Sequence, residues 1–175
     1  LGIDARWLVI NGTPEFFQLT KRLHHSLHGE SGDGSELGSA ERELYAATLR
    51  DNAVDLCSRV RPGDIVLLHD PQTAGLAQEL TRVGALVAWR CHIGHDSSNA
   101  QSELGWEFLR PFIQDVPAFV FSKRSYAPSW CAPDRVVVIP PSIDAFSAKN
   151  QDLDSSTVRS ILVHTGLVEG PMPEN

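Results

Sequence analysis

Short, continuous apolar runs alternate along this chain with segments whose apolar residues recur every three or four positions. The runs predict strands over residues 5–10, 65–68, 85–91, 118–121 and 136–139. Continuous apolar strands separated by amphipathic helices are typical of parallel sheets that helices flank. The pattern therefore predicts an α/β fold with a doubly wound, mostly parallel sheet.

Helical spacing is clearest in the segment that begins at Pro14. Thr13 is a good N-cap, proline suits the first helical position, and Gly29 provides a stop. The inner face of this helix is predicted to consist of Phe16, Leu19, Leu23 and Leu27. Further helices are predicted over residues 39–60, 70–83 and 102–113, and Pro111 is expected to bend or end the last one. The polar, glycine-rich residues 30–38 between the first two helices predict a mobile loop.

Composition narrows the class of protein. A hydrophobic content of 42% and a charged content of 21% are ordinary for a globular chain. The net charge of -7 argues against nucleic acid as a partner, which usually demands a basic surface. No apolar run approaches the roughly 20 residues that span a bilayer, so no membrane partner is expected. Three widely spaced cysteines favour a reduced, cytoplasmic setting.

The length of 175 residues suits one folded domain. We expect a Rossmann-like domain over residues 1–150. Residues 151–175 are expected to form a linker and the start of a further domain, because the tail closes on a Pro/Gly-rich stretch. The chain enters a predicted strand almost at once and has no initiating Met, so a fragment of a longer protein is expected.

Polar, ionisable side chains follow two of the buried strands. His69 and Asp70 end the first, and Arg90, His92 and Asp96 lie at or beyond the end of the second. Ligands of open α/β sheets bind beyond the carboxyl ends of the strands. These five residues are therefore candidates for a polar substrate pocket. Two structural alternatives stay open: the Asp70 side chain could cap the next helix, and His92 could only cap its loop.

Other kinds of site fit the sequence less well. A zinc cluster could be drawn from Cys91, His92, His95 and Asp96. Adjacent Cys and His side chains leave a strand on opposite faces, however, and the chain holds no second ligand pair. His24 and His28 have a metal-compatible spacing but no third ligand. We therefore predict no metal site.

Common catalytic and nucleotide-binding motifs are missing as well. The chain contains no dinucleotide-binding glycine fingerprint, no phosphate-binding loop and no serine-hydrolase elbow. This weakens the alternative of a nucleotide-dependent oxidoreductase. We therefore predict that no cofactor is bound.

Several motifs, in order along residues 4–153, carry a family resemblance. They are Asp4-Ala-Arg-Trp-Leu-Val-Ile, Pro14-Glu-Phe-Phe with Thr20-Lys21 and His24, Leu27-His-Gly29, Val66-Leu-Leu-His-Asp-Pro-Gln72, Trp89-Arg-Cys-His92, Phe108-Leu-Arg-Pro111, and Ile139-Pro-Pro-Ser-Ile-Asp144 with Lys149-Asn150. Together they resemble the N-terminal domain of trehalose glycosyltransferring synthases, which are retaining GT-B enzymes of glycosyltransferase family 4. Fungal-type trehalose phosphorylases are similar in the same region.

The resemblance implies transfer of glucose from a nucleotide-diphosphate glucose to glucose, giving trehalose with retained configuration. The first domain would shape the acceptor side, and a second domain would hold most of the nucleotide, so this chain alone is expected to be inactive. In related enzymes the histidine after the strand that matches residues 85–91 contacts the donor sugar, which gives that catalytic role to His92. The family needs no bound metal, since basic side chains and helix N-termini neutralise the leaving group.

Alternative functions remain at this point. One is a trehalose phosphorylase of the same family, and another is a non-catalytic sugar-binding module with the same fold. Glucose and a nucleotide-glucose are the expected binding partners, and a homodimer is a further expectation.

Overall fold

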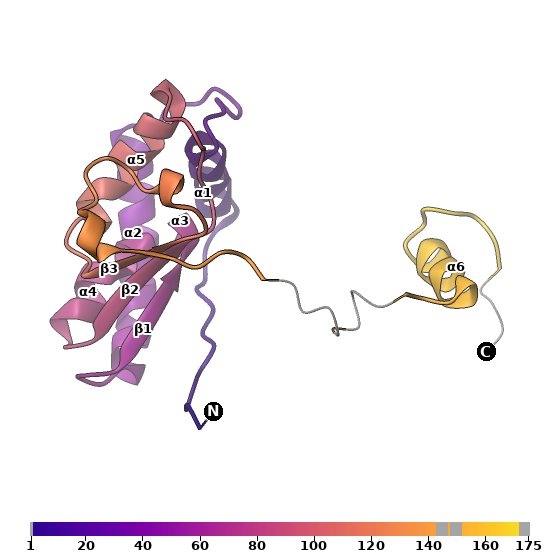
Figure 1. Ribbon diagram of the computed structural model, residues 1–175, viewed down its shortest axis with the longest axis horizontal. Coiled ribbons are helices and arrows are strands. Elements are labelled where there is room, and N and C mark those ends of the chain that lie inside the picture. Colours follow the sequence, from indigo (N-terminus) through magenta and orange to yellow (C-terminus); the bar gives the residue numbers. More distant parts are fainter. Residues whose placement is uncertain (1, 143–146, 148–151, 172–175) are drawn as a thin grey trace. The chain divides into compact units, whose positions relative to one another are not determined.

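The computed structural model describes residues 2–142, 147 and 152–171. The chain divides into two units, Leu1–Pro140 and Pro141–Asn175. The first unit contains the sheet and the helices that pack on it (Figure 1). Among the described residues of the second unit is one helix, α6 (Ser155–His164), whose N-cap Asp154 accepts hydrogen bonds from the amides of Ser156 and Thr157. The predicted domain assignment of residues 151–175 stays a prediction.

Four parallel strands form the sheet of the first unit, in the order β1-β2-β3-β4. They are β1 (Ile65–His69), β2 (Leu86–Cys91), β3 (Ala118–Phe121) and β4 (Val136–Val138). Each strand follows a short connection or a helix, so that neighbours in sequence are neighbours in the sheet. This confirms the predicted α/β class and the parallel sheet.

Helices pack against one face of this sheet (Figure 1). They are α1 (Pro14–Leu27), α2 (Ser39–Arg59), α3 (Asp70–Thr73), α4 (Ala77–Arg82) and α5 (Ala100–Ile113), with single 3₁₀ turns at Ala74–Leu76, Arg124–Tyr126 and Pro133–Arg135. Thr13 caps α1 as predicted, since its hydroxyl accepts from the amide of Phe16. Among the described residues, none is in a helix long and apolar enough to cross a membrane.

Alternation along β2 shows which face the helices cover. Trp89 and Cys91 are completely buried beneath the helices, whereas Leu86 on the opposite face is 59% exposed. On the same open face, Ile65 of β1 is 80% exposed. Residues of β1 and β2 that share this open face, including Arg90, can therefore reach solvent.

Aromatic side chains fill the core between sheet and helices. Trp89 makes edge-to-face contacts with Trp106 of α5 and with Phe119 and Phe121 of β3. A second cluster surrounds Tyr45 of α2, which contacts Phe16, Phe108 and Phe112. Such contacts each add about 0.5–1.5 kcal/mol to the stability that burial alone provides. The first cluster fixes α5 on the strands that carry the candidate site, and the second joins α2 to α1 and α5.

The predicted strand over residues 5–10 is wrong. This segment has no regular secondary structure, and Trp7 and Val9 are 79% and 78% exposed. A continuous apolar run forms a strand only when a neighbouring strand pairs with its backbone groups. The described sheet contains only β1 to β4, so the segment has no ladder partner among the described residues.

The structure also corrects two helix predictions. The helix expected over residues 70–83 is broken into α3, a 3₁₀ turn and α4. Gly75 lies in the break, where a Cβ atom would come within 2.9 Å of the Tyr45 ring, so the backbone approaches that ring closely. Pro111, by contrast, does not end α5. Its missing N–H would leave the carbonyl of Glu107 unpaired, but the guanidinium of Arg42 donates to that carbonyl at 3.3 Å.

Candidate functional site

The candidate site lies at the carboxyl ends of β1 and β2. His69, the last residue of β1, pairs in register with Arg90 of β2. Asp70 follows β1 directly, and His92 comes just after the end of β2. His92 is two residues beyond Arg90 and therefore continues the same open face. The structure thus brings together four of the five residues predicted for the pocket.

Asp70 has an unusual backbone conformation. Its φ of 59° makes it the single non-glycine residue with a positive φ within the described part of the chain. Aspartate tolerates this left-handed region better than most residues, but such conformations still cost on the order of 1–3 kcal/mol. The side chain forms no hydrogen bond that caps α3. The alternative that Asp70 acts as a helix cap is therefore wrong.

Buried side chains hold the turn around Asp70 in place. The Trp89 indole donates to the carbonyl of Asp70 at 3.0 Å, and the Thr73 hydroxyl donates to the carbonyl of His69 at 2.7 Å. The Tyr45 hydroxyl donates to the carbonyl of Pro71. These bonds fix the backbone on both sides of the strained residue, and they let the strain persist.

The carboxylate of Asp70 binds His92 through both backbone and side chain. Its Oδ1 accepts from the amide of His92 at 2.9 Å, and the imidazole Nδ1 lies 3.2 Å from both Oδ1 and Oδ2. The His92 side chain is 41% exposed and that of Asp70 is 28% exposed. The pair is therefore shielded on one side and open to a ligand on the other. Nε2 is the ring nitrogen that Asp70 does not engage.

His69 lies against the same pair. Its ring stacks on that of His92, with centroids 5.9 Å apart and planes 15° apart, and the ring of Trp7 lies 5.6 Å away. Partial burial lowers the pKa of His69, with a smaller effect in the same direction from His92 and Arg90; the carboxylate of Asp70 acts in the opposite direction. We expect neutral His69 to be favoured in the folded state.

The end of α1 approaches the site as well. Partial burial and then the neighbouring His28 lower the pKa of His24, while the charge of Asp70 raises it. This interaction places His24 within electrostatic range of the Asp70 carboxylate. The periodicity of α1 predicted its core face but gave no sign that the half-buried His24, at the edge of that face, flanks the site.

Asp96 is engaged by groups that follow β3. Its carboxylate accepts from the Ser125 hydroxyl at 2.8 Å and lies 3.0 Å from the Lys123 ammonium. These two hydrogen bonds hold the pKa of Asp96 below its usual range. Asp96 thus links the loops after β2 and β3, while Asp70 binds His92. The sequence interpretation missed Lys123 and Ser125, although the strand-end rule applies equally to residues that follow Phe121.

Cys91 and His92 face opposite sides of the sheet. Cys91 is fully buried, its thiol donates to the carbonyl of Ile93, and burial raises the pKa of that thiol far above its usual range. The imidazole of His92 instead faces solvent. Within the described ranges, no group of three His, Cys, Asp or Glu residues is arranged to hold a metal ion. Ile143, Asp144, Lys149 and Asn150 of the predicted motifs lie outside the described residues.

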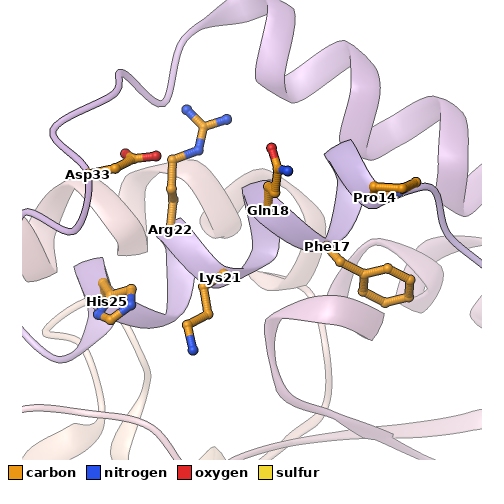
Figure 2. A pocket seen from close by; sticks show the side chains of 7 residues that line it. All are labelled: Pro14, Phe17, Gln18, Lys21, Arg22, His25 and Asp33. Atoms are coloured by element: carbon orange, nitrogen blue, oxygen red, sulfur yellow. The ribbon is translucent and has the colours of Figure 1, made fainter.

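An open hollow of about 420 Å³ lies elsewhere, along the exposed side of α1. Figure 2 shows its lining side chains, which are Pro14, Phe17, Gln18, Lys21, Arg22, His25 and Asp33. Two of its basic side chains already have partners: Arg22 donates to the carbonyl of Glu36, and His25 pairs with the carboxylate of Glu30. None of the predicted site residues lines this hollow, so the strand ends remain the candidate site.

Comparison with known proteins shows which family the chain belongs to. The sequence model described as "Trehalose synthase, N-terminal domain" matches residues 1–128. The chain belongs to this family. The trehalose synthase of Thermococcus litoralis is 38% identical over 164 residues, which are 93% of this chain and 37% of that protein. The trehalose synthase of Rubrobacter xylanophilus is 34% identical over 174 residues, or 97% of this chain and 40% of that protein.

More distant relatives agree with this family. A trehalose phosphorylase of Grifola frondosa is 24% identical over 169 residues, which cover 89% of this chain and 23% of that protein. The solved α,α-trehalose-phosphate synthase (UDP-forming) of Burkholderia vietnamiensis matches with a TM-score of 0.53 at 20% identity, over 65% of this chain and 29% of that one. This second likeness concerns the fold alone.

Membership of the trehalose synthase N-terminal family confirms the resemblance found in the motifs. It supports an enzyme of the glycosyltransferase type with a role in trehalose metabolism. The chain spans about two-fifths or less of the length of these curated trehalose synthases. The activity of a whole protein, its substrates and its partners are therefore matters for proposal.

Proposed function

We propose that this chain is the acceptor-side part of a retaining glycosyltransferase that moves glucose from a nucleotide-diphosphate glucose to glucose and so forms trehalose. Membership of the trehalose synthase family over residues 1–128 supports the reaction class. The single observation that carries the proposal at the level of residues is the His92 imidazole held by Asp70 at a solvent-facing strand end. Ligands of such sheets bind at this edge.

His92 would contact the glucose that is transferred. Positive charge develops at the anomeric carbon as the bond to the diphosphate breaks, and a positioned polar group that interacts more strongly in that state lowers the barrier. His69 and Arg90 lie beside His92 on the open face and would bind sugar hydroxyls. Asp96, with Lys123 and Ser125, would extend the polar rim at the same edge of the sheet.

The remaining parts of the proposal concern the setting of the reaction. Nucleotide-diphosphate glucose is the donor substrate, and no metal is required because basic side chains and helix N-termini can neutralise the diphosphate. Most of the nucleotide would bind a second domain, which the family resemblance implies. A cytoplasmic location and a homodimer are further parts of this proposal.

The test is product formation by the full-length protein and by the 175-residue chain. The full-length protein incubated with glucose and ADP-, UDP- or GDP-glucose should form α,α-trehalose, identified by NMR of its anomeric signals. The 175-residue chain should give no product above the background without protein. Turnover by this chain alone would contradict the proposed division between acceptor and nucleotide domains.

A second candidate is a trehalose phosphorylase, which the match to the Grifola frondosa protein favours. The same assay separates it from the first. Trehalose that forms from glucose 1-phosphate and glucose, but from no nucleotide-glucose, would favour the phosphorylase. Sugar binding without any product from either donor would favour a non-catalytic module.

A further inference from the structure

We propose that Asp70 is a positioning residue that fixes the His92 imidazole in its Nδ1–H tautomer and so presents Nε2 as the nitrogen that faces substrate. The catalytic consequence rests on the function proposed above, but the tautomer itself does not. The inference is carried by the geometry of two side chains that lie 22 residues apart in sequence.

The hydrogen-bond pattern sets the tautomer. An ionised carboxylate can only accept hydrogen bonds, and both of its oxygens lie 3.2 Å from Nδ1 of His92. Nδ1 must therefore carry the hydrogen. In the neutral ring, Nε2 then has a free lone pair and can accept a hydrogen bond from a sugar hydroxyl. The bond from the His92 amide to Oδ1 keeps the backbone from rotating the ring away.

The Asp70 carboxylate is held in place by a backbone conformation that is unfavourable for a non-glycine residue. A positive φ turns the side chain toward β2, and the Trp89 indole, itself on β2, holds the carbonyl of the same residue. Strained conformations of this kind cluster at functional sites. Because the carboxylate is occupied by His92, we assign Asp70 to orientation, in place of the direct substrate contact that the sequence suggested.

Asp70→Asn is the sharpest substitution. Asparagine has nearly the same shape and also tolerates a positive φ, so the turn should be retained. Its oxygen can still accept from the His92 amide, while its amide nitrogen can donate to Nδ1. The asparagine oxygen can also accept from Nδ1–H, so the side chain can pair with either tautomer, the exclusive preference for Nδ1–H is lost, and the Nε2–H form of the neutral ring becomes populated. Asp55→Asn is the matched control, because the Asp55 carboxylate pairs with Arg59 on the exposed side of α2, away from the strand ends.

The measurement is long-range ¹H–¹⁵N correlation of the histidine rings in the 175-residue chain, near pH 8.5, about two units above the ordinary histidine pKa. We expect His92 to show a protonated Nδ1 and a bare Nε2 in the wild type and in Asp55→Asn, and a clearly larger share of the Nε2–H form in Asp70→Asn. A wild-type ring protonated at Nε2 would overturn the proposal, and that result needs no variant to fold. An unchanged tautomer in folded Asp70→Asn would also overturn it.

The kinetic test uses the full-length protein. Asp70→Asn should lower kcat by about 10²-fold or more while KM for glucose changes little, since an isosteric change to the wrong tautomer removes an interaction made mainly in the transition state. Asp55→Asn should leave both constants unchanged. Equal kcat in Asp70→Asn and wild type, with trehalose still formed, would overturn the positioning role. Absence of trehalose in the wild type would contradict the proposed function, and the NMR result would still decide the role of Asp70.

Discussion

Replacing Tyr45 by phenylalanine tests whether the turn that carries Asp70 depends on one buried hydroxyl. Tyr45 is completely buried on α2, and its hydroxyl donates to the carbonyl of Pro71 and accepts from the amide of Gly75 at 3.1 Å. The phenylalanine ring would keep the contacts with Phe16, Phe108 and Phe112. The substitution therefore removes two hydrogen bonds and leaves the packing of the aromatic cluster in place.

The magnitude follows from what the two backbone groups lose. Pro71 is buried, so the loss of the hydroxyl that donates to its carbonyl costs about 1–3 kcal/mol. Gly75 is half-buried, and water can partly replace the hydroxyl there, so its share is roughly 0.5–1 kcal/mol. Together these contributions should lower the free energy of unfolding by about 1.5–4 kcal/mol. For a chain of this size that corresponds to a Tm lower by about 3–16 °C.

Urea denaturation and calorimetry of the 175-residue chain measure this change. Tyr126→Phe is the control, because the structure records a contact of the Tyr126 ring with Lys123 but no hydrogen bond of its hydroxyl within the described residues. Its effect should stay within about 0.5 kcal/mol. If Tyr45→Phe unfolds at the same midpoint as Tyr126→Phe, the turn does not depend on this hydroxyl and the reasoning is refuted.

Three further predictions concern packing, pH and metal. Gly75→Ala should destabilise the chain by about 1–3 kcal/mol, because its Cβ would lie 2.6 Å from Leu49 and 2.9 Å from Tyr45; an unchanged urea midpoint would show that the contact relaxes freely. The pKa values of His24 and His69 are lowered in the folded state, so the unfolded chain binds more protons and stability should fall as pH drops below about 6.5. Replacing both by Gln should flatten the dependence of Tm on pH between about 5 and 7, and an equal slope would contradict the assigned shifts. Full-length protein treated with a chelator should keep its Tm and its rate, whereas stoichiometric zinc whose removal lowers the Tm would contradict the metal-free pocket.

Local signals in the sequence were sufficient for most of the elements. The cap at Thr13 and the apolar spacing that follows it predicted α1 closely, and continuous apolar runs located β1 to β4. The remaining features of the fold depend on contacts between segments that are distant in sequence. Residues 5–10 carry strand-like residues, but pairing depends on a neighbour that no local pattern reveals. The continuation of α5 through Pro111 depends on Arg42, which lies 65 residues from the carbonyl of Glu107 that it satisfies.

The candidate site, likewise, could be predicted from the sequence only in part. The rule that ligands bind at strand ends is enough, with the sequence alone, to assign His69, Asp70, Arg90 and His92 to one edge of the sheet. The bond between Asp70 and His92 depends on the register of β1 and β2 and on the positive φ at Asp70. Neither the register nor this φ can be predicted from the presence of an aspartate in the sequence. The partners of Asp96 depend on a third strand end, which carries Lys123 and Ser125.

The central claim is that the His92 site takes part in glucosyl transfer, and steady-state kinetics of His92→Ala in the full-length protein test it most directly. The control is His25→Ala, because His25 pairs with Glu30 on the exposed side of α1. With nucleotide-glucose and glucose as substrates, we expect His92→Ala to lower kcat by about 10²-fold or more, with folding intact, while His25→Ala retains the wild-type rate. A correctly folded His92→Ala variant with unchanged kcat would contradict the account and reduce His92 to a structural residue.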